Sequence, residues 1–312
     1  MTAWYDAHII LVQSTFISFL LALSIQFPMR MGVFSFAGVA NYALGAYTAA
    51  IVVTRSEEMV SPAVAVGAGV LVAVAVAFVL ALVVRRLRGL YLAMATISVS
   101  LIVQVAAYNG GDLTGGASGM YGVISDLTIG TVIAVCIVSA IALGISERGK
   151  LSRRIDVVRE DPELAASMGV NVNGYRLVAF LVSAVFGALA GGLEVLLRST
   201  ISPTNVGFAL VVTALTIIIV GGFKSWLGAA IGSIIVTWLP YYLQEVERYQ
   251  QLVYATLVVL AAIFVPGGLL GLADELRRRV ARRFLKEPEG DGGPDGAVGL
   301  PAETRSEMEG AL

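Results

Sequence analysis

Residues 61–84 read SPAVAVGAGVLVAVAVAFVLALVV, a stretch without a single charged side chain. A membrane-spanning helix needs about 20 consecutive apolar residues, so this stretch predicts one. The rest of the chain has the same character: hydrophobic residues make up 57% and charged residues 14% of its 312 residues. In soluble proteins, hydrophobic residues average roughly 45–50% and charged residues roughly 25%. A soluble domain of this size could not cover its surface with so few charges, which excludes a soluble enzyme.

Eight further stretches are apolar and long enough to be candidate spans. The weakest of the nine is 32–53, which is rich in glycine and alanine and carries Asn41 and Tyr42. It could form a broken or re-entrant helix, which is tolerated only where protein or a cavity surrounds it. The sequence therefore predicts an all-α polytopic membrane protein with about nine transmembrane helices, at 8–28, 32–53, 61–84, 90–108, 127–146, 175–197, 207–223, 226–243 and 250–267.

The basic residues predict the orientation of these helices. With the N-terminus outside, only three of the 21 lysines and arginines, namely Arg55, Arg198 and Arg248, fall on the outer side. Cytoplasmic loops are enriched in lysine and arginine, so this bias predicts an outer N-terminus. An odd number of spans then places the C-terminus in the cytoplasm. Asp6 precedes the first span where a signal peptide would carry basic residues, and we expect that span to be retained.

The composition divides the chain into a membrane domain and a tail. Residues 1–286 hold the predicted spans, and the longest loop on the cytoplasmic side runs over 147–174. Residues 287–312 are rich in glycine and proline and hold seven acids against one base, Arg305. They offer little apolar surface to bury, so we expect a disordered acidic cytoplasmic tail.

The 147–174 loop contains a predicted helix of about two turns. Asp161 suits the N-cap position, Pro162 the first helical position and Gly169 the position just past the helix end. Leu164 and Met168 are four residues apart and therefore share one face. So short a helix is unstable alone in water. It has to dock either on a cytoplasmic partner or at the membrane interface.

This loop resembles the EAA loop of ABC-importer permeases, specifically of the branched-chain amino-acid permeases of the LivM type. The residues that carry the resemblance are Arg159, Glu160, Glu163, Leu164, Ala165, Ala166 and Gly169. The residues that it assigns to ATPase coupling are Asp161, Pro162, Glu163, Leu164, Ala165, Ala166, Met168 and Gly169. Other stretches resemble motifs of the same family in the same order. They lie within 32–49, 87–91, 113–122, 202–203 and 220–228.

The resemblance implies the ABC-importer permease fold, with this chain as half of a translocation pore for branched-chain amino acids. It implies that residues 161–169 couple the pore to separate ATPases, so that this chain is itself no enzyme and needs no cofactor or metal. The implied partners are a LivH-like sister permease, two cytoplasmic ATPases of the LivG and LivF type and an extracytoplasmic solute-binding protein. The implied location is a bacterial or archaeal plasma membrane, in contact with lipid and not with nucleic acid.

Polar side chains recur at every fourth position of the fourth predicted span, at Thr96, Ser100, Gln104 and Tyr108. A polar face within a membrane has to meet protein or a water-filled path, so we interpret this one as lining of a transport pathway. Hydrogen bonding to neighbouring helices is the alternative. Weaker candidates for the same lining are Asn41, Tyr42, Thr213 and Thr216.

Glu194 is the one clear acid within a predicted span. It lies near the outer end of that span, and Arg198 follows four residues later. We expect an ion pair at the outer rim, and a gate or a site for an amino group is the alternative. Two glycine pairs with the spacing of closely packed membrane helices predict helix contacts: Gly187 with Gly191, and Gly228 with Gly232.

Other functions find less support in the sequence. The stretch 144–151 resembles a phosphate-binding loop, but Leu151 stands where serine or threonine would meet magnesium, so we expect no ATP binding. An ion-coupled secondary transporter usually needs acids near the membrane midplane, and Glu194 is peripheral. An intramembrane enzyme needs a convergent set of polar groups, which the sequence does not offer. Urea, amides and other small amino acids stay open as alternative substrates.

Overall fold

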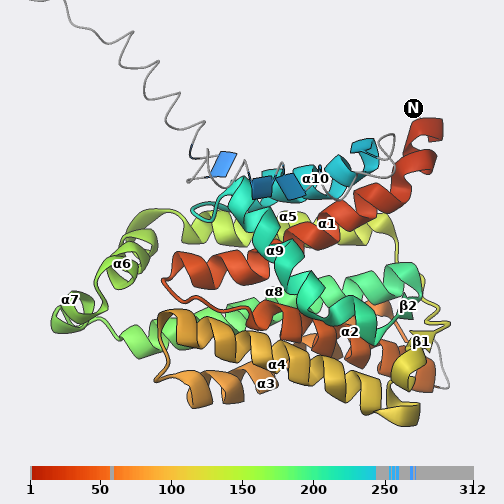
Figure 1. Ribbon diagram of the computed structural model, residues 1–312, viewed down its shortest axis with the longest axis horizontal. Helices are drawn as coiled ribbons and strands as arrows, with labels where there is room; N and C mark the ends of the chain where they lie inside the picture. Colours follow the sequence, from red (N-terminus) through yellow and green to blue (C-terminus); the bar gives the residue numbers. More distant parts are fainter. Residues whose placement is uncertain are drawn as a thin grey trace, which may run out of the picture. The chain divides into compact units, whose positions relative to one another are not determined.

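The computed structural model describes residues 2–56 and 60–243, together with positions 253, 255, 256, 258, 259, 268, 269 and 271. The expected ninth span, 250–267, lies largely outside these residues, and the expected tail, 287–312, lies wholly outside them. Six helices in the described part are long and apolar enough to cross a membrane, which confirms an all-α polytopic fold (Figure 1). They are α1 (Thr2–Arg30), α2 (Ala37–Arg55), α3 (Pro62–Val84), α4 (Gly89–Asn109), α5 (Ile129–Ser146) and α8 (Val172–Arg198).

Short elements gather at the two ends of this helical bundle (Figure 1). One end, which we call the α7 end, carries α6 (Gly149–Glu160) and α7 (Pro162–Ser167). The opposite end, the β1–β2 end, carries a two-stranded antiparallel sheet in which Met120 lies opposite Ile201. Its elements are β1 (Met120–Tyr121), β2 (Thr200–Ile201) and the 3-10 helices η1 (Gly111–Leu113), η2 (Gly116–Ser118) and η3 (Pro203–Val206).

The spans expected at 207–223 and 226–243 form a bent pair of helices instead of two full crossings. α9 (Phe208–Gly221) and α10 (Trp226–Tyr242) meet at an angle of 116° across a short break. At 1.5 Å per residue, the 14 residues of α9 extend about 21 Å, less than the roughly 30 Å of hydrocarbon. The backbone turns at Gly222, whose φ of 104° favours glycine. The count of nine spans is therefore not confirmed in the described residues.

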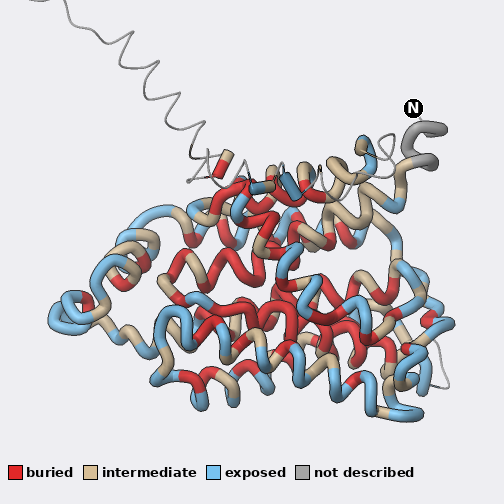
Figure 2. The backbone as a smooth tube through the Cα atoms, viewed as in Figure 1, coloured by how far each residue is buried: buried red, intermediate tan, exposed pale blue. Residues whose placement is uncertain are grey.

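The weakest expected span, 32–53, forms one continuous helix. α2 begins at Ala37, later than expected, and most of its side chains are buried. It packs against α8, α3 and α4, and Figure 2 shows buried residues concentrated along this central layer. The small residues that make this stretch look weak as a span are the ones that let neighbouring helices approach it.

α3 divides its surface between protein and surroundings by side-chain size. Small residues recur at every fourth position, and Ala65, Ala73 and Ala77 are fully buried against the rest of the bundle. Large residues such as Leu71 and Val83 point outward and are more than two thirds exposed. An apolar outward face is what a helix in lipid presents, so the 61–84 stretch has the surface of an outer helix of a membrane bundle.

Close backbone contact joins α2 to α8. A Cβ atom built on Gly187 would lie 2.5 Å from the carbonyl oxygen of Gly38. One built on Gly191 would overlap the carbonyl oxygen of Tyr42. The reciprocal contact comes from Gly45 of α2, where a Cβ would lie 2.5 Å from the carbonyl oxygen of Ala188. The structure therefore confirms that Gly187 and Gly191 serve helix packing.

The second glycine pair packs in the same way. A Cβ atom built on Gly228 of α10 would overlap the carbonyl oxygen of Gly222, just after α9. One built on Gly232 would overlap the carbonyl oxygen of Ile217 within α9. These two glycines therefore hold the bent pair closed, as their spacing predicts.

We expect Gly191→Ala to destabilise the fold and Gly67→Ala to leave it intact. A methyl group at position 191 would meet the Tyr42 backbone, and overpacking of this kind costs about 1–3 kcal/mol. A Cβ atom built on Gly67 of α3 would meet open space among the described residues. Gly67→Ala is therefore the matched control. Thermal unfolding of the detergent-solubilised protein measures both. Equal midpoints for the two variants would show that the α2–α8 contact is not tight.

Candidate functional site

The N-terminus of α7 carries the cap that the sequence predicts. One carboxylate oxygen of Asp161 accepts hydrogen bonds from the backbone N–H groups of Glu163 (2.9 Å) and Leu164 (3.0 Å). Pro162 is the first residue of the helix, where its missing N–H needs no partner. The cap therefore satisfies the free donors of a helix that makes few bonds of its own.

The C-terminus of α7 ends in a Schellman turn. Gly169 has a φ of 81°. Its N–H donates to the carbonyl oxygen of Ala166, and the N–H of Val170 donates to that of Ala165, both at 3.0 Å. This pair of bonds defines the motif and requires a left-handed residue between them. This confirms the sequence prediction that Gly169 stands just past the end of the helix.

The apolar side chains of α7 divide between the inside and the surface. Ala165 is fully buried. Leu164 and Met168 are 53% and 69% exposed, so the described part of the chain leaves both uncovered. Two large apolar side chains on a rigidly capped turn form a ready contact for another surface.

A buried polar cluster lies beneath α6, where sequence reasoning expected only an inner positive charge. The Arg30 guanidinium, at the end of α1, donates to the hydroxyls of Ser152 in α6 (3.0 Å) and Ser146 in α5 (3.5 Å). It also faces the Glu147 carboxylate at 3.9 Å, and both side chains are largely buried. These four residues, which we call the Arg30–Glu147 cluster, tie α1 to the junction of α5 and α6.

The same carboxylate holds the start of α10. Glu147 accepts hydrogen bonds from the Ser225 hydroxyl (2.9 Å) and the Trp226 backbone N–H (2.8 Å). The Gln26 side chain of α1 adds a bond to the carbonyl oxygen of Phe223 (3.2 Å). The turn between α9 and α10 is therefore fastened to the α5–α6 junction. An acid directly after a span is the one signal of this contact in the sequence, because the partners of Glu147 are distant in the chain.

Thr96 and Ser100, expected on the transport pathway, lie buried between helices. The Thr96 hydroxyl accepts a hydrogen bond from the Phe36 backbone N–H (3.0 Å), and the Ser100 hydroxyl lies 3.5 Å from the Phe36 carbonyl oxygen. Both hydroxyls also donate to carbonyls of α4 itself. The structure therefore favours the alternative, in which these two residues hold the start of α2 against α4.

The other two polar residues of this helix face, Gln104 and Tyr108, lie toward the β1–β2 end. Gln104 donates to the carbonyl oxygen of Pro203 in η3 (2.9 Å), and Tyr108 is exposed. On α9, Thr213 is exposed and Thr216 is buried, and each donates to a carbonyl of its own helix. The structure thus does not bring these residues into one site with Thr96.

Asn41 and Tyr42 occupy the tight α2–α8 contact. Both side chains are buried, and the Asn41 amide nitrogen lacks a hydrogen-bond partner among the described residues. Tyr42 reaches toward the β1–β2 end, where it borders a small cavity together with Glu194.

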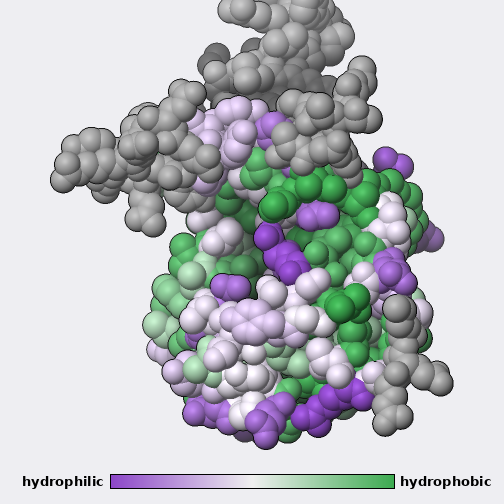
Figure 3. All heavy atoms as spheres, turned by 90° about the vertical axis from the view of Figure 1, so that its right-hand side faces the viewer, coloured by the Kyte–Doolittle hydropathy of each residue, from purple (hydrophilic) through white to green (hydrophobic). Residues whose placement is uncertain are grey.

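Glu194 and Arg198 form the ion pair that the sequence predicts. The Arg198 side chain contacts the Glu194 carboxylate one helical turn away and also donates to the hydroxyl of Ser14 (2.7 Å). Figure 3 views the molecule from the β1–β2 end, where hydrophilic residues collect at the middle of the face and along its lower edge.

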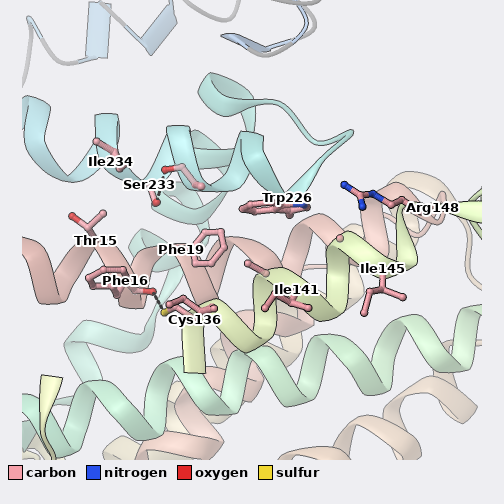
Figure 4. Close-up of a pocket in the computed structure, with 14 residues that line it drawn as sticks. Thr15, Phe16, Phe19, Cys136, Ile141, Ile145, Arg148, Trp226, Ser233 and Ile234 are labelled. Atoms are coloured by element: carbon pink, nitrogen blue, oxygen red, sulfur yellow. Dashed lines mark hydrogen bonds between the residues drawn. The ribbon is translucent and has the colours of Figure 1, made fainter. Parts of the chain in front are cut away.

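An apolar groove of about 520 Å³ lies between α1, α5 and α10 (Figure 4). Phe16, Phe19 and Ile141 line it, and Arg148 stands at the α7 end beside Trp226. The thiol of Cys136 lies on its wall, 3.6 Å from the Phe16 carbonyl oxygen. Hydrocarbon suits this lining better than a polar solute does.

A family model described as "Branched-chain amino acid transport system / permease component" matches residues 8–263. The chain belongs to this permease family. The matched residues include α7, the Arg30–Glu147 cluster and the Glu194–Arg198 pair, so all of these features lie within a permease component.

Curated relatives carry the same kind of name. The chain is 25% identical over 221 residues to the high-affinity branched-chain amino acid transport system permease protein LivM of Escherichia coli (strain K12), covering 60% of this chain and 52% of that protein. It is 27% identical over 165 residues to BraD of Pseudomonas aeruginosa, covering 52% and 53%. It is 30% identical over 122 residues to a probable LivH of Methanocaldococcus jannaschii, covering 36% and 38%. The chain spans about half the length of the first of these relatives. No solved structure matches it.

We expect Ser100→Leu in this permease to lower the yield of folded protein, because a large side chain would push α4 away from Phe36. Ser98 lies on the same helix, is exposed and, among the described residues, donates to a carbonyl of α4 alone. Ser98→Leu is therefore the matched control and should keep full yield. Size-exclusion chromatography in detergent compares the two. Full yield for Ser100→Leu combined with abolished transport would restore the pathway interpretation of this residue.

Proposed function

We propose that this chain is the permease subunit of an ABC importer and forms half of a translocation pore for branched-chain amino acids. Membership of the permease family supports the transport role. The relatives from Escherichia coli and Pseudomonas aeruginosa are named for branched-chain amino acid transport. A LivH-like sister permease forms the other half of the pore, and a solute-binding protein delivers the substrate. Two cytoplasmic subunits hydrolyse ATP, so this chain is no enzyme.

The observation that carries the coupling role is the exposed apolar pair on α7. Leu164 and Met168 are uncovered by the described chain, although α7 is rigidly capped at both ends. In the proposed complex, each side chain is buried in a cleft of an ATPase subunit. Residues 161–169 then move with that subunit as it binds and hydrolyses ATP.

The Arg30–Glu147 cluster carries this movement into the membrane domain. Ser152 of α6 is bound to Arg30, and Glu147 is bound to the first residues of α10. A displacement of α6 therefore acts on α1 and on the bent α9–α10 pair together. This supports a mechanism in which the docking loop alternates the pore between inward-open and outward-open states.

The distribution of charge supports an orientation with the α7 end in the cytoplasm. Arg30 and Glu147 meet at this end, and Arg85 and Arg176 border one cavity there. Arg55 and Arg198 lie at the β1–β2 end. In the plasma membrane of a bacterium or archaeon this arrangement places the N-terminus outside.

We expect Gly169→Val to uncouple ATP hydrolysis from transport. A left-handed conformation costs a non-glycine residue about 1–2 kcal/mol, which corresponds to roughly a tenfold loss of the docked geometry. Among the described residues other than its two chain neighbours, none comes within 4 Å of a Cβ built at this position, so the effect comes from the backbone conformation. Gly169→Asn is the matched control, because asparagine tolerates this conformation.

The measurement is substrate-stimulated ATPase activity of the assembled complex, with assembly followed by co-purification. Gly169→Asn should retain most of the stimulation that Gly169→Val loses. Normal assembly together with full stimulation in Gly169→Val would contradict a coupling role for α7.

A further inference from the structure

A small cavity of about 220 Å³ opens at the β1–β2 end between α2, α8 and the η3 segment. Its lining includes one carboxylate and one guanidinium on adjacent turns of α8. The polar side chains that border it are Tyr42, Glu194, Arg198, Thr200 and Asn205.

The other large side chains of the lining are aliphatic. They are Val195, Ile201, Val206 and Leu210, and Val195, Ile201 and Val206 are buried. A cavity lined by a pair of opposite charges and by branched aliphatic side chains matches the chemistry of an aliphatic amino acid, which has two opposite charges and a hydrocarbon side chain.

The pair remains reachable although it lies within a helix bundle. The Glu194 side chain is 21% exposed and that of Arg198 is 43% exposed. Arg198 has a second partner in Ser14. A ligand that separates the two side chains therefore does not have to extract either of them from a sealed core.

We propose that this cavity binds a zwitterionic aliphatic α-amino acid, with its ammonium group on Glu194, its carboxylate on Arg198 and its side chain against Val195 and Val206. The inference rests on the proposed function and adds the residues that recognise the substrate. The internal ion pair is exchanged for two charge-assisted bonds to the ligand, so neither charge is left without a partner before or after binding.

This site discriminates among the substrates that the sequence left open. Urea and simple amides carry neither an ammonium nor a carboxylate group, and they cannot replace both halves of the Glu194–Arg198 pair. A site that has to break an ion pair rejects them, because each charged group would lose its partner without gaining another. Branched-chain amino acids supply both charges and a hydrocarbon side chain for the aliphatic part of the lining.

The first test measures leucine uptake and ATPase activity in proteoliposomes that contain the complete complex with its binding protein. Glu194→Gln and Arg198→Gln each remove one charge and should lower uptake by about tenfold or more. Arg55→Gln is the control, because Arg55 lies at the same end and donates only to the Asp112 carbonyl oxygen among the described residues. It should transport as the unaltered chain does.

The charge-exchanged variant separates recognition from structural support. Glu194→Arg combined with Arg198→Glu keeps an ion pair but reverses its direction relative to the aliphatic side chains of the lining. We expect it to assemble normally and to stay deficient in uptake. Uptake restored by the exchange, or normal uptake in both single variants, would overturn the site. Failure of the unaltered complex to take up leucine would instead contradict the proposed function.

The second test leaves both charges in place. In a Cys136→Ser background, Thr200→Cys places a thiol on the cavity wall, where position 200 is exposed. Leucine should slow its modification by a small methanethiosulfonate reagent several-fold. 4-Methylpentanoate and 3-methylbutylamine, each of which lacks one charged group, should not. Equal protection by all three compounds, or none by leucine, would contradict zwitterion recognition.

Discussion

The backbones of α2 and α8 meet in close contact, and the neighbouring helices pack around them. Glycine at 187 and 191 lets the two helices meet without intervening side chains, and α1 and α3 pack around the pair. This contact also positions Tyr42 beside the cavity at the β1–β2 end. A methyl group at these glycines would move an entire helix layer, because membrane helices associate through packing and not through the exclusion of water.

α8 links the two candidate sites directly. Its N-terminus, capped by the Asn171 side chain, follows the turn at Gly169, and its C-terminal turn carries Glu194 and Arg198. With 27 residues, it extends about 40 Å and crosses the bundle from one end to the other. A displacement of residues 161–169 and a change at the cavity beside Glu194 would therefore both involve this helix. The Arg30–Glu147 cluster adds a second connection through α1 and α10.

Local chemistry was predictable from the sequence, and contacts between distant segments were not. The caps at Asp161 and Gly169, the Glu194–Arg198 pair and the paired glycines each lie within one or two turns, where spacing determines geometry. Glu147 bonds to residues almost 80 positions away in the chain. Thr96 bonds to Phe36, and two helices lie between them in the sequence. Hydropathy alone suggested two crossings in 207–243, because it does not register the turn that glycine permits at position 222.

The central claim is that α7 joins this permease to an ATPase through Leu164 and Met168. Photocross-linking tests it most directly, with benzoylphenylalanine at Met168 and, as a control, at Val83, which is exposed on the outward face of α3. In the intact complex, we expect an adduct between position 168 and an ATPase subunit and none from position 83. Adducts of position 168 with lipid alone, in a complex that retains its ATPases, would contradict it.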